Sequence, residues 1–229
     1  GMPEAIINND KQSLNYIIND IIQKDIIKRY DIRKPNQLRS IIKFLISNVS
    51  NLISYRSISR NFKLNTVTIQ KFIEITEETY LIFTINKFDK KIKNIDKNPK
   101  KIYCIDNGIA IMNSAGLNEQ KGTLLENLVA VELKRRGKQF YYYNNKDKTE
   151  TDFITIKGNE FKKLPDEIIQ VCVNPENPLT KEREEKAVMQ TLKELNQKKA
   201  IIITLDFEEE KKIGKKTIQY IPAWKWLLQ

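Results

Sequence analysis

The stretch Gly122-Thr-Leu-Leu-Glu-Asn-Leu-Val-Ala-Val-Glu-Leu133 divides the chain into two regions with different sequence patterns. Its apolar side chains recur at three- and four-residue spacing, as at Leu125 and Val129, which predicts an amphipathic helix over residues 122–136. Gly137 follows as the C-terminal cap, because glycine adopts the left-handed conformation at no steric cost. Strand-like segments follow this helix, and mostly helical segments precede it.

The region after Gly137 alternates between strand-like and helix-like segments. The resulting order, α-β-β-β-α-β-β, predicts an α/β fold in which helices cover a mixed sheet. A charged turn is expected between the last two strands. Strands are expected at residues 139–143, 151–156, 167–173, 200–205 and 217–221, and the second helix at residues 181–196.

The region before residue 106 begins with helices. The apolar spacing predicts amphipathic helices over residues 11–30 and 38–49, with Asp10 as the N-cap of the first and Pro35 as the break between them. A short helix at Ser57–Phe62 and a tight turn then lead to a longer helix capped by Thr66. A short helix, a turn and a second helix form the helix-turn-helix pattern.

Two further strands are expected after the helix-turn-helix, at residues 80–88 and 101–105. A hairpin in this position would be a wing, so the sequence predicts a helical and winged-helix domain over residues 1–105 and a second domain over residues 106–229. The connection between the two strands is rich in lysine, which suits phosphate contact. These lysines are Lys87, Lys90, Lys91, Lys93, Lys97, Lys100 and Lys101.

On this interpretation, Gln70 and Lys71 of the second helix would face a groove of DNA. Two alternatives stay open. Helix-turn-helix geometry also serves as a packing arrangement in domains that never touch DNA, and a lysine-rich hairpin can simply be solvated.

The net charge points in the same direction. The chain has 40 basic and 29 acidic side chains, a formal charge of +11, which favours a polyanionic partner. Residues 1–100 carry 18 basic and 10 acidic side chains, whereas residues 101–229 carry 22 and 19. The first region is therefore expected to face nucleic acid. The alternative is a composition rich in Ile, Lys and Asn, typical of AT-rich coding, with lysines on solvated faces.

The composition excludes several classes of enzyme. The chain has no histidine, which rules out Ser-His-Asp and Cys-His catalysis, histidine-metal nucleases and most zinc enzymes. Its two cysteines, Cys104 and Cys172, cannot form a disulfide scaffold, so a cytoplasmic location is expected. The apolar runs are shorter than the roughly 18–20 residues that span a bilayer, and no signal peptide is visible. No membrane partner is therefore expected.

Two motifs bear on catalysis. Lys121-Gly-Thr123 lacks the order of a phosphate-binding P-loop, so we expect no ATP hydrolysis by this chain. Glu150 and Asp152 alternate on one predicted strand and project from the same face. With Glu126 on a helix and Gln170 on a third strand, they match the way in which a Mg²⁺-dependent phosphodiesterase site is assembled. Solvated surface carboxylates are the alternative.

Several segments carry a family resemblance. The stretch quoted above, Tyr141-Tyr-Tyr, Glu150-Thr-Asp-Phe and Ile169-Gln-Val-Cys172 closely resemble the C-terminal region of a group of prokaryotic AAA-type ATPases. In that group an ATPase module precedes a winged-helix region and a domain of unknown function. The resemblance extends over nearly the whole chain and includes Pro3-Glu-Ala-Ile6, Asp25–Tyr30, Asn98–Tyr103, Asp106–Gly108 and Trp224–Leu228. Gly1-Met2 resembles a tag remnant, and the nucleotide-binding module is missing from the sequence.

The resemblance implies a PD-(D/E)XK restriction-endonuclease-like domain with core order αβββαβ. It places Glu126 and Asp152 as metal-binding acids, Gln170 at the acid position of the acid-x-lysine motif, and Cys172 at its lysine. An amide contributes no charge and a thiol cannot replace an ammonium group. We therefore expect a degenerate, inactive site, with Mg²⁺ as the cofactor only if it functions. Lys186 or Arg183 could substitute for the lysine.

Three functions follow from the sequence. The first is a DNA-binding fragment of an AAA ATPase-like protein, which uses Gln70, Lys71 and the wing lysines. The second is a Mg²⁺-dependent nuclease whose catalytic residues are Glu126, Asp152 and Gln170. The third is an interaction or assembly module for an ATPase partner or a homo-oligomer.

Overall fold

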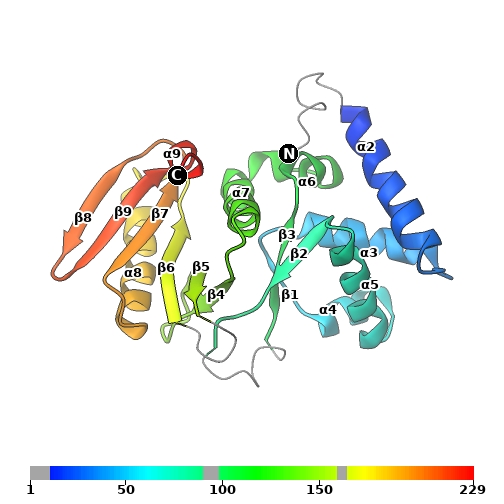
Figure 1. The fold of residues 1–229 in the computed structure, drawn as a ribbon, viewed down its shortest axis with the longest axis horizontal. Helices are drawn as coiled ribbons and strands as arrows, with labels where there is room; N and C mark the ends of the chain where they lie inside the picture. Colours follow the sequence, from blue (N-terminus) through cyan, green and yellow to red (C-terminus); the bar gives the residue numbers. More distant parts are fainter. Residues whose placement is uncertain (1–10, 90–97, 159–163) are drawn as a thin grey trace. The chain divides into compact units, whose positions relative to one another are not determined.

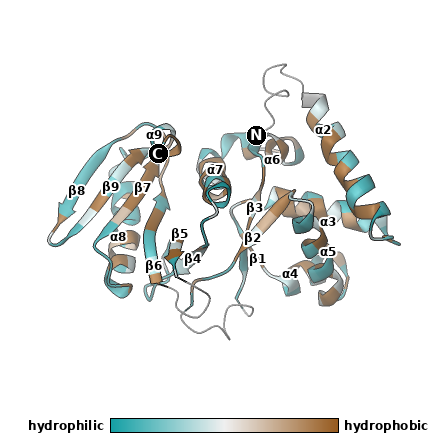
Figure 2. Cartoon of the chain, viewed as in Figure 1, coloured by the Kyte–Doolittle hydropathy of each residue, from teal (hydrophilic) through white to brown (hydrophobic). Residues whose placement is uncertain are grey.

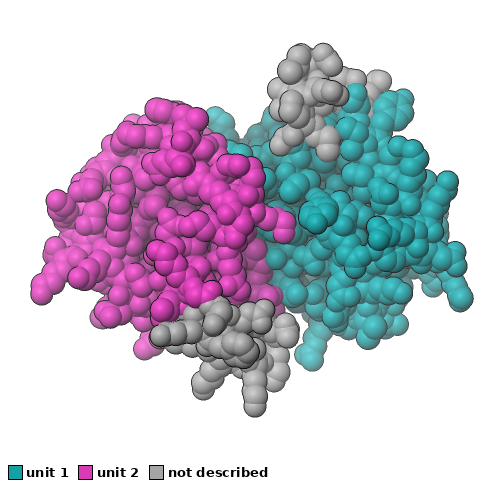
Figure 3. Space-filling model, viewed as in Figure 1, with its two compact units in different colours: residues 1–84, 99–131 teal, residues 85–98, 132–229 magenta. Residues whose placement is uncertain are grey.

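The computed structural model describes residues 11–89, 98–158 and 164–229 (Figure 1). The chain packs into two compact units (Figure 3). Unit 1 comprises residues 1–84 and 99–131, and unit 2 comprises residues 85–98 and 132–229. Asp10, the expected first cap, and Pro3–Ile6 lie outside the described residues.

Unit 1 begins with one continuous helical segment, α2 (Lys11–Asp20) followed by the π-helix η1 (Ile21–Lys28). Its buried side chains Leu14, Ile18, Ile22 and Ile26 are spaced four residues apart. At 3.6 residues per turn, such a row would drift by about 40° each turn. The wider π turns compensate for this drift, so the row keeps facing the core. The helix expected over residues 11–30 is present, and the four-residue spacing of its buried side chains accounts for the change from α-helix to π-helix.

Helix α3 (Pro35–Ser47) begins at the proline itself, whose fixed φ suits the first turn. Its apolar face lies at the centre of the core of unit 1. That core also includes Ile109 and Ala110 of helix α6 (Asn107–Asn113) and Leu117 of the 3₁₀ turn η3 (Leu117–Glu119).

The helix-turn-helix pair is formed by α4 (Tyr55–Phe62) and α5 (Thr66–Glu78). Ser54 caps α4 by accepting the Ser57 N–H, and Asn65 caps α5 by accepting the Thr68 N–H at 2.7 Å. The expectation that Thr66 caps α5 is therefore wrong by one residue. Both residue types can accept this bond, so composition could not decide between them.

Three short strands complete unit 1: β1 (Leu52–Ile53), β2 (Ile82–Ile85) and β3 (Lys100–Cys104). They form a sheet of order β1-β3-β2, in which β1 runs antiparallel to β3. The two-residue strand β1 was not expected, because a periodicity of two cannot be detected over two residues.

Unit 2 is built on a mixed six-stranded sheet of order β4-β5-β6-β7-β9-β8. β6, β7 and β9 are parallel neighbours, whereas the pairs β4–β5, β5–β6 and β8–β9 are antiparallel. This arrangement confirms the expected α/β class with a mixed sheet. The strands are β4 (Phe140–Asn144), β5 (Glu150–Lys157), β6 (Leu164–Val171), β7 (Lys199–Thr204), β8 (Glu209–Ile213) and β9 (Lys216–Pro222).

Three helices accompany this sheet in the chain: α7 (Lys121–Arg135), α8 (Pro178–Glu194) and α9 (Ala223–Leu227). The charged turn expected before the last strand is wrong, because β8 lies there. Its sequence Glu-Glu-Lys-Lys-Ile has a single apolar residue, the partly buried Ile213, and Figure 2 colours most of the strand as hydrophilic. An edge strand exposed in this way carries charges instead of an apolar alternation.

Two segments pack with a different unit from the one that the expected boundary at residue 105 would give them. Residues 106–131 join unit 1, because α6 and η3 bury their apolar side chains in its core. Residues 85–98 join unit 2, where Lys87 forms an isolated backbone β-bridge with Tyr142 and Phe88 is buried. The boundary between domains as folding units stays a prediction.

Candidate functional site

Asp152 and Gln170 lie side by side on neighbouring strands of unit 2. The register that pairs Phe153 with Ile169 places them opposite each other on β5 and β6. The Gln170 side-chain oxygen accepts the Asp152 N–H at 3.1 Å, and Asp152 Oδ2 accepts the Val171 N–H at 3.0 Å. Both side chains are buried. Two of the residues that the sequence names for a catalytic site are thus neighbours in the fold, and their catalytic role stays a prediction.

A third member, Glu184 of α8, was not found from the sequence. It is buried, and Glu184 Oε2 accepts a hydrogen bond from the Gln170 amide at 2.8 Å. The Arg183 guanidinium donates to Glu184 Oε1 at 2.6 Å. A signal for Glu184 was present, because it continues the buried row of Ala187, Val188, Thr191 and Leu192 at helical spacing. A carboxylate in an apolar row requires a buried partner.

Cys172 is the neighbouring side chain at the position of the missing lysine. Burial raises the pKa of its thiol to about 11, and the negative charge of Glu184 adds to the rise. The thiol is therefore neutral at physiological pH and supplies no charge to the cluster. Of the two suggested replacements, Arg183 bonds Glu184, whereas Lys186 is exposed.

Glu126 belongs to unit 1, whereas Asp152 and Gln170 belong to unit 2. On α7, Glu126 forms an ion pair of 2.9 Å with the buried Lys101 and accepts the Tyr103 hydroxyl at 2.8 Å. Lys101, expected in the solvated wing, is only 3% exposed and so does not contribute to a wing tip. The reason is its position on β3 beside a carboxylate that neutralises it.

The cluster in unit 2 does not fit a Mg²⁺ ion as it stands. The Gln170 oxygen is directed at a backbone N–H, and Glu184 uses one oxygen for Gln170 and the other for Arg183. Across the parts of the chain that the structure describes, no three acidic or thiol side chains converge as a metal site. We therefore derive no catalytic step through a metal.

A second candidate site covers α4 and α5. We name it the α4–α5 surface: Arg56 and Arg60 on α4, Lys63 in the turn, and Gln70 and Lys71 on α5, all exposed. Arg56, Ser59, Arg60 and Thr66 line an open hollow of about 450 Å³. Val67 beside it is 75% exposed. Cationic and small polar side chains around such a hollow can receive a phosphate group.

The cations of this surface form no ion pair with the part of the chain that the structure describes. Within residues 11–89, 98–158 and 164–229, no ion pair involves Arg56, Arg60, Lys63 or Lys71. The Gln70 amide donates to Glu74 at 2.9 Å, so contact with a base would first require this bond to break.

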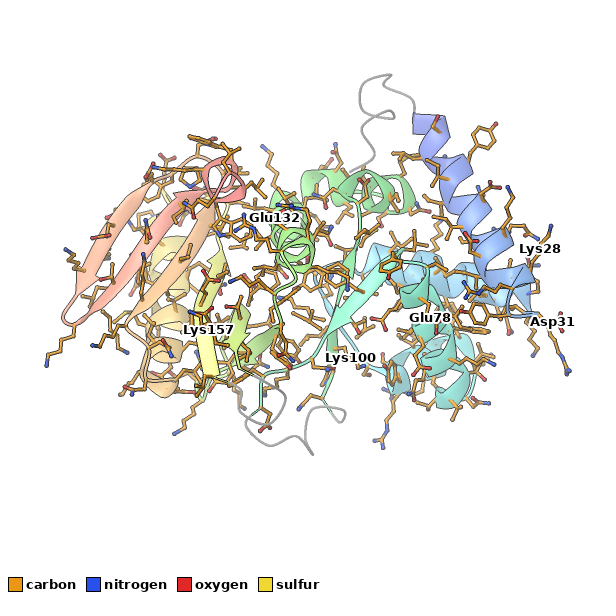
Figure 4. All side chains as sticks on the ribbon, in the orientation of Figure 1. Lys28, Asp31, Glu78, Lys100, Glu132 and Lys157 are labelled. Carbon is orange, nitrogen blue, oxygen red and sulfur yellow. The ribbon has the colours of Figure 1, made fainter. Side chains whose placement is uncertain are left out.

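The expected wing is only partly described. Lys100 Nζ lies 5.7 Å from the ring centroid of Tyr55, at the start of α4 (Figure 4). Lys90, Lys91, Lys93 and Lys97, the four lysines predicted to contact nucleic acid in the wing, lie outside the described residues. Their role stays a prediction.

Comparison with known proteins assigns the chain to a family. Residues 1–121 match the family described as "Domain of unknown function (DUF8612)", and the chain belongs to it. Residues 121–226 match a second family, "Domain of unknown function (DUF4143)". No helix among the described residues is long and apolar enough to cross a membrane.

Two relatives are uncharacterised proteins. One is protein MJ1544 of Methanocaldococcus jannaschii, 32% identical over 247 aligned residues that cover all of this chain and 53% of the relative. The other comes from Haemophilus influenzae, with 29% identity over 237 residues that cover all of this chain and 56% of the relative. The chain thus spans about half the length of the curated relatives it matches. No solved structure matches it.

Proposed function

We propose that this chain is the nucleic-acid-binding part of an AAA ATPase-like protein and that its α4–α5 surface contacts duplex DNA. The observation that carries the proposal is the group of four exposed cations, Arg56, Arg60, Lys63 and Lys71, without acidic partners in the described chain. Unneutralised cations on a protein surface attract the phosphate backbone and release its counterions on binding.

The order of elements supports a winged helix. The capped pair α4–α5 is followed by β2 and β3, which join β1 in one small sheet. In a helix-turn-helix protein the second helix enters the major groove with its N-terminal residues. In this chain those residues are exposed: Thr66, Val67 and Gln70. They would contact base edges, while Arg60 and Lys71 would contact phosphates.

The association with an ATPase is proposed from the resemblance to the C-terminal regions of AAA-type ATPases. The roughly twofold length of the two relatives leaves room for a further module in those proteins. The chain order helix α7, three strands, helix α8, strand β7 supports the resemblance to the PD-(D/E)XK fold, with most of α7 in unit 1 and the other elements in unit 2. The closed hydrogen-bond network around Gln170 supports a degenerate site.

Binding of a labelled duplex at increasing salt concentration tests this proposal. We expect binding that weakens steeply with salt, because each phosphate contact contributes about one unit to the slope of log K against log salt. The double variant Arg60→Glu/Lys71→Glu should lower this slope by about two and weaken binding at every salt concentration.

The matched control is Lys28→Glu/Lys43→Glu, which makes the same change of charge at two exposed lysines of η1 and α3. Lys28 is labelled in Figure 4. An equal loss of binding in the control would mean that net charge alone drives association. Absence of binding by the native chain at low salt would overturn the proposal and favour an assembly module for an ATPase partner.

A nuclease is the second candidate, because two buried carboxylates, Asp152 and Glu184, lie in one hydrogen-bond network with Gln170, which accepts the Asp152 backbone N–H and donates to Glu184. The amide at position 170 sets this candidate behind DNA binding, since it adds none of the charge that a divalent cation requires.

A further inference from the structure

Five lysines gather at one end of the sheet of unit 2, well separated in sequence from α4 and α5. We name this group the lysine edge: Lys193 near the end of α8, Lys198 and Lys199 where β7 begins, and Lys215 and Lys216 where β9 begins. In Figure 1 the connection from α8 to β7 and the turn from β8 to β9 lie at the same end of the sheet.

The strand register brings these lysines together. β7 and β9 are parallel neighbours, with Lys199 opposite Thr217, and the Thr217 N–H donates to the Lys198 carbonyl at 2.8 Å. Neighbouring strands lie about 4.8 Å apart. The register therefore brings Lys198 and Lys199 next to the start of β9, where Lys215 and Lys216 lie, and Lys193 adds a fifth charge near the end of α8.

Acidic side chains do not neutralise the lysine edge. Among the residues that the structure describes, none of the five lysines forms an ion pair. The nearest acid in sequence, Glu194, accepts hydrogen bonds from the Tyr143 hydroxyl, the Lys146 N–H and the Gln190 amide. Asp166 pairs with Lys157, which is labelled in Figure 4.

The pKa of Lys216 reflects the positive charge of the lysine edge. Its ammonium group is half-buried and donates to the Met189 carbonyl at 3.5 Å. Burial lowers the pKa of Lys216, and the positive charge of Lys193 lowers it further. Two ammonium groups thus repel each other here without a counter-charge, and a bound anion would relieve this repulsion.

We propose that the lysine edge binds the phosphate backbone of a nucleic acid and forms a second contact surface besides the α4–α5 surface. This inference rests on the proposed function for the class of partner, but on different residues in a different unit. Lysines act as point charges on flexible stems, which suits contact with phosphates and carries no base recognition. The lysine edge therefore adds affinity that does not depend on sequence.

A membrane surface fits less well. Interfacial binding combines cations with inserted aromatic or aliphatic side chains. Large exposed apolar side chains of the described part of unit 2, among them Leu205, Trp224 and Leu228, follow the carboxyl ends of β7 and β9, at the opposite end of these parallel strands. Only Leu164 of that group lies at the amino ends, where β6 begins.

Charge reversal with a labelled duplex tests the proposal. The triple variant Lys193→Glu/Lys199→Glu/Lys215→Glu leaves the half-buried Lys216 in place. We expect the slope of log K against log salt to fall by about three, equally for duplexes of different sequence. The matched control is Lys28→Glu/Lys34→Glu/Lys43→Glu in unit 1, which makes the same change in net charge and should retain more binding.

Two comparisons separate this inference from the proposed function. Loss of binding in Arg60→Glu/Lys71→Glu with native-like binding in the triple variant would overturn the lysine edge alone. The reverse result would overturn the α4–α5 surface and leave the lysine edge. Binding to vesicles of phosphatidylglycerol and phosphatidylcholine in the absence of DNA binding would overturn both.

An acetylation footprint of the native chain tests the proposal even if a variant does not fold. Lysine acetylation with and without the duplex, read by mass spectrometry, needs no substitution. Protection of Lys193, Lys198, Lys199 and Lys215 on binding is the expected result. Unchanged acetylation at these four positions, with DNA bound, would overturn the proposal.

Discussion

The two candidate sites treat their charged side chains in opposite ways. On the α4–α5 surface of unit 1, Arg56, Arg60 and Lys71 are exposed and lack acidic partners within the described ranges. In unit 2, Asp152 and Glu184 are buried, and the neutral Gln170 holds them in one hydrogen-bond network. Charges left in water are available to a ligand, whereas charges bonded inside the fold already have partners. This contrast favours binding by unit 1 over chemistry by unit 2.

The contrast extends to the buried acids themselves. Unit 1 neutralises Glu126 with the opposite charge of Lys101, whereas in unit 2 the Glu184 carboxylate accepts a hydrogen bond from the neutral amide of Gln170, whose oxygen accepts the Asp152 backbone N–H. The first arrangement depends on keeping a cation, and the second depends on leaving position 170 uncharged. Substitutions at Lys101 and Gln170 therefore test the two arrangements directly.

The largest effect is expected for Lys101→Met. It removes the ammonium group that lies 2.9 Å from the Glu126 carboxylate, which is 14% exposed, and the loss of one partner of a buried pair costs about 3–5 kcal/mol of unfolding free energy. Urea unfolding monitored by circular dichroism measures this cost. The double variant Lys101→Met/Glu126→Met is the control and should recover most of the loss. Equal destabilisation in both variants would mean that packing, and not charge, dominates at this position.

Gln170→Glu should have the next largest effect. The new carboxylate would meet Glu184 where the amide now donates at 2.8 Å, and it could no longer donate to it. We expect a loss of about 2–3 kcal/mol at neutral pH, because a bonded amide is replaced by an unpaired buried charge. The close carboxylates would have a raised pKa in the folded state. The loss should therefore shrink as the pH falls towards the ordinary pKa of glutamate.

The same variant, Gln170→Glu, tests whether a third carboxylate lets the cluster of Asp152 and Glu184 bind a metal. With three carboxylates the cluster would gain the charge that a hard cation requires. Mg²⁺ should raise the melting temperature of Gln170→Glu but not that of the native chain, since a ligand that binds only the folded state stabilises it. The uncharged variant Gln170→Met is the control. An equal rise in the native chain would show that its cluster binds the metal after all.

Much of the architecture follows from local pattern. Apolar residues at helical spacing predicted α3 and α8, and alternating or continuous apolar runs predicted β5 and β7, because burial of one face imposes the period of the element. The edge strand β8 was missed, since Ile213 is its one apolar residue and its sequence therefore carries no apolar period. A strand bounded by solvent is fixed by its neighbour in the sheet, which local sequence does not specify.

The candidate site was predictable only in part, for a related reason. Asp152 and Gln170 followed from their strands, and the buried row on α8 could have identified Glu184. The partner of Glu126 could not be inferred, because Lys101 is one of seven lysines between residues 87 and 101. Only tertiary packing distinguishes the buried lysine from the others, since local pattern assigns all seven to a solvated connection.

The smallest effect is expected at Glu132 of α7, a buried carboxylate whose partner Arg135 is exposed. Hydrogen bonds from Arg135 lower the pKa of Glu132 from 4.5 to about 2, and Arg136 adds to the lowering against the opposing effect of burial. Arg136 also donates to the Trp226 carbonyl at 2.8 Å, and its guanidinium lies over the Trp226 ring. Arg136, which also bonds Glu132, therefore connects the end of α7 to α9.

A depressed carboxyl pKa stabilises the fold above the unfolded value, and this contribution is lost as the pH falls from about 4.5 towards 2. Glu132→Gln should thus cost stability at neutral pH and very little at pH 2. We expect about 1 kcal/mol, well below the full linkage value, because Arg135 is 69% exposed and solvent screens its charge. Unfolding free energies measured across this pH range give the difference. A constant difference at all pH values would mean that Glu132 acts through shape and hydrogen bonding, and that its charge contributes nothing to stability.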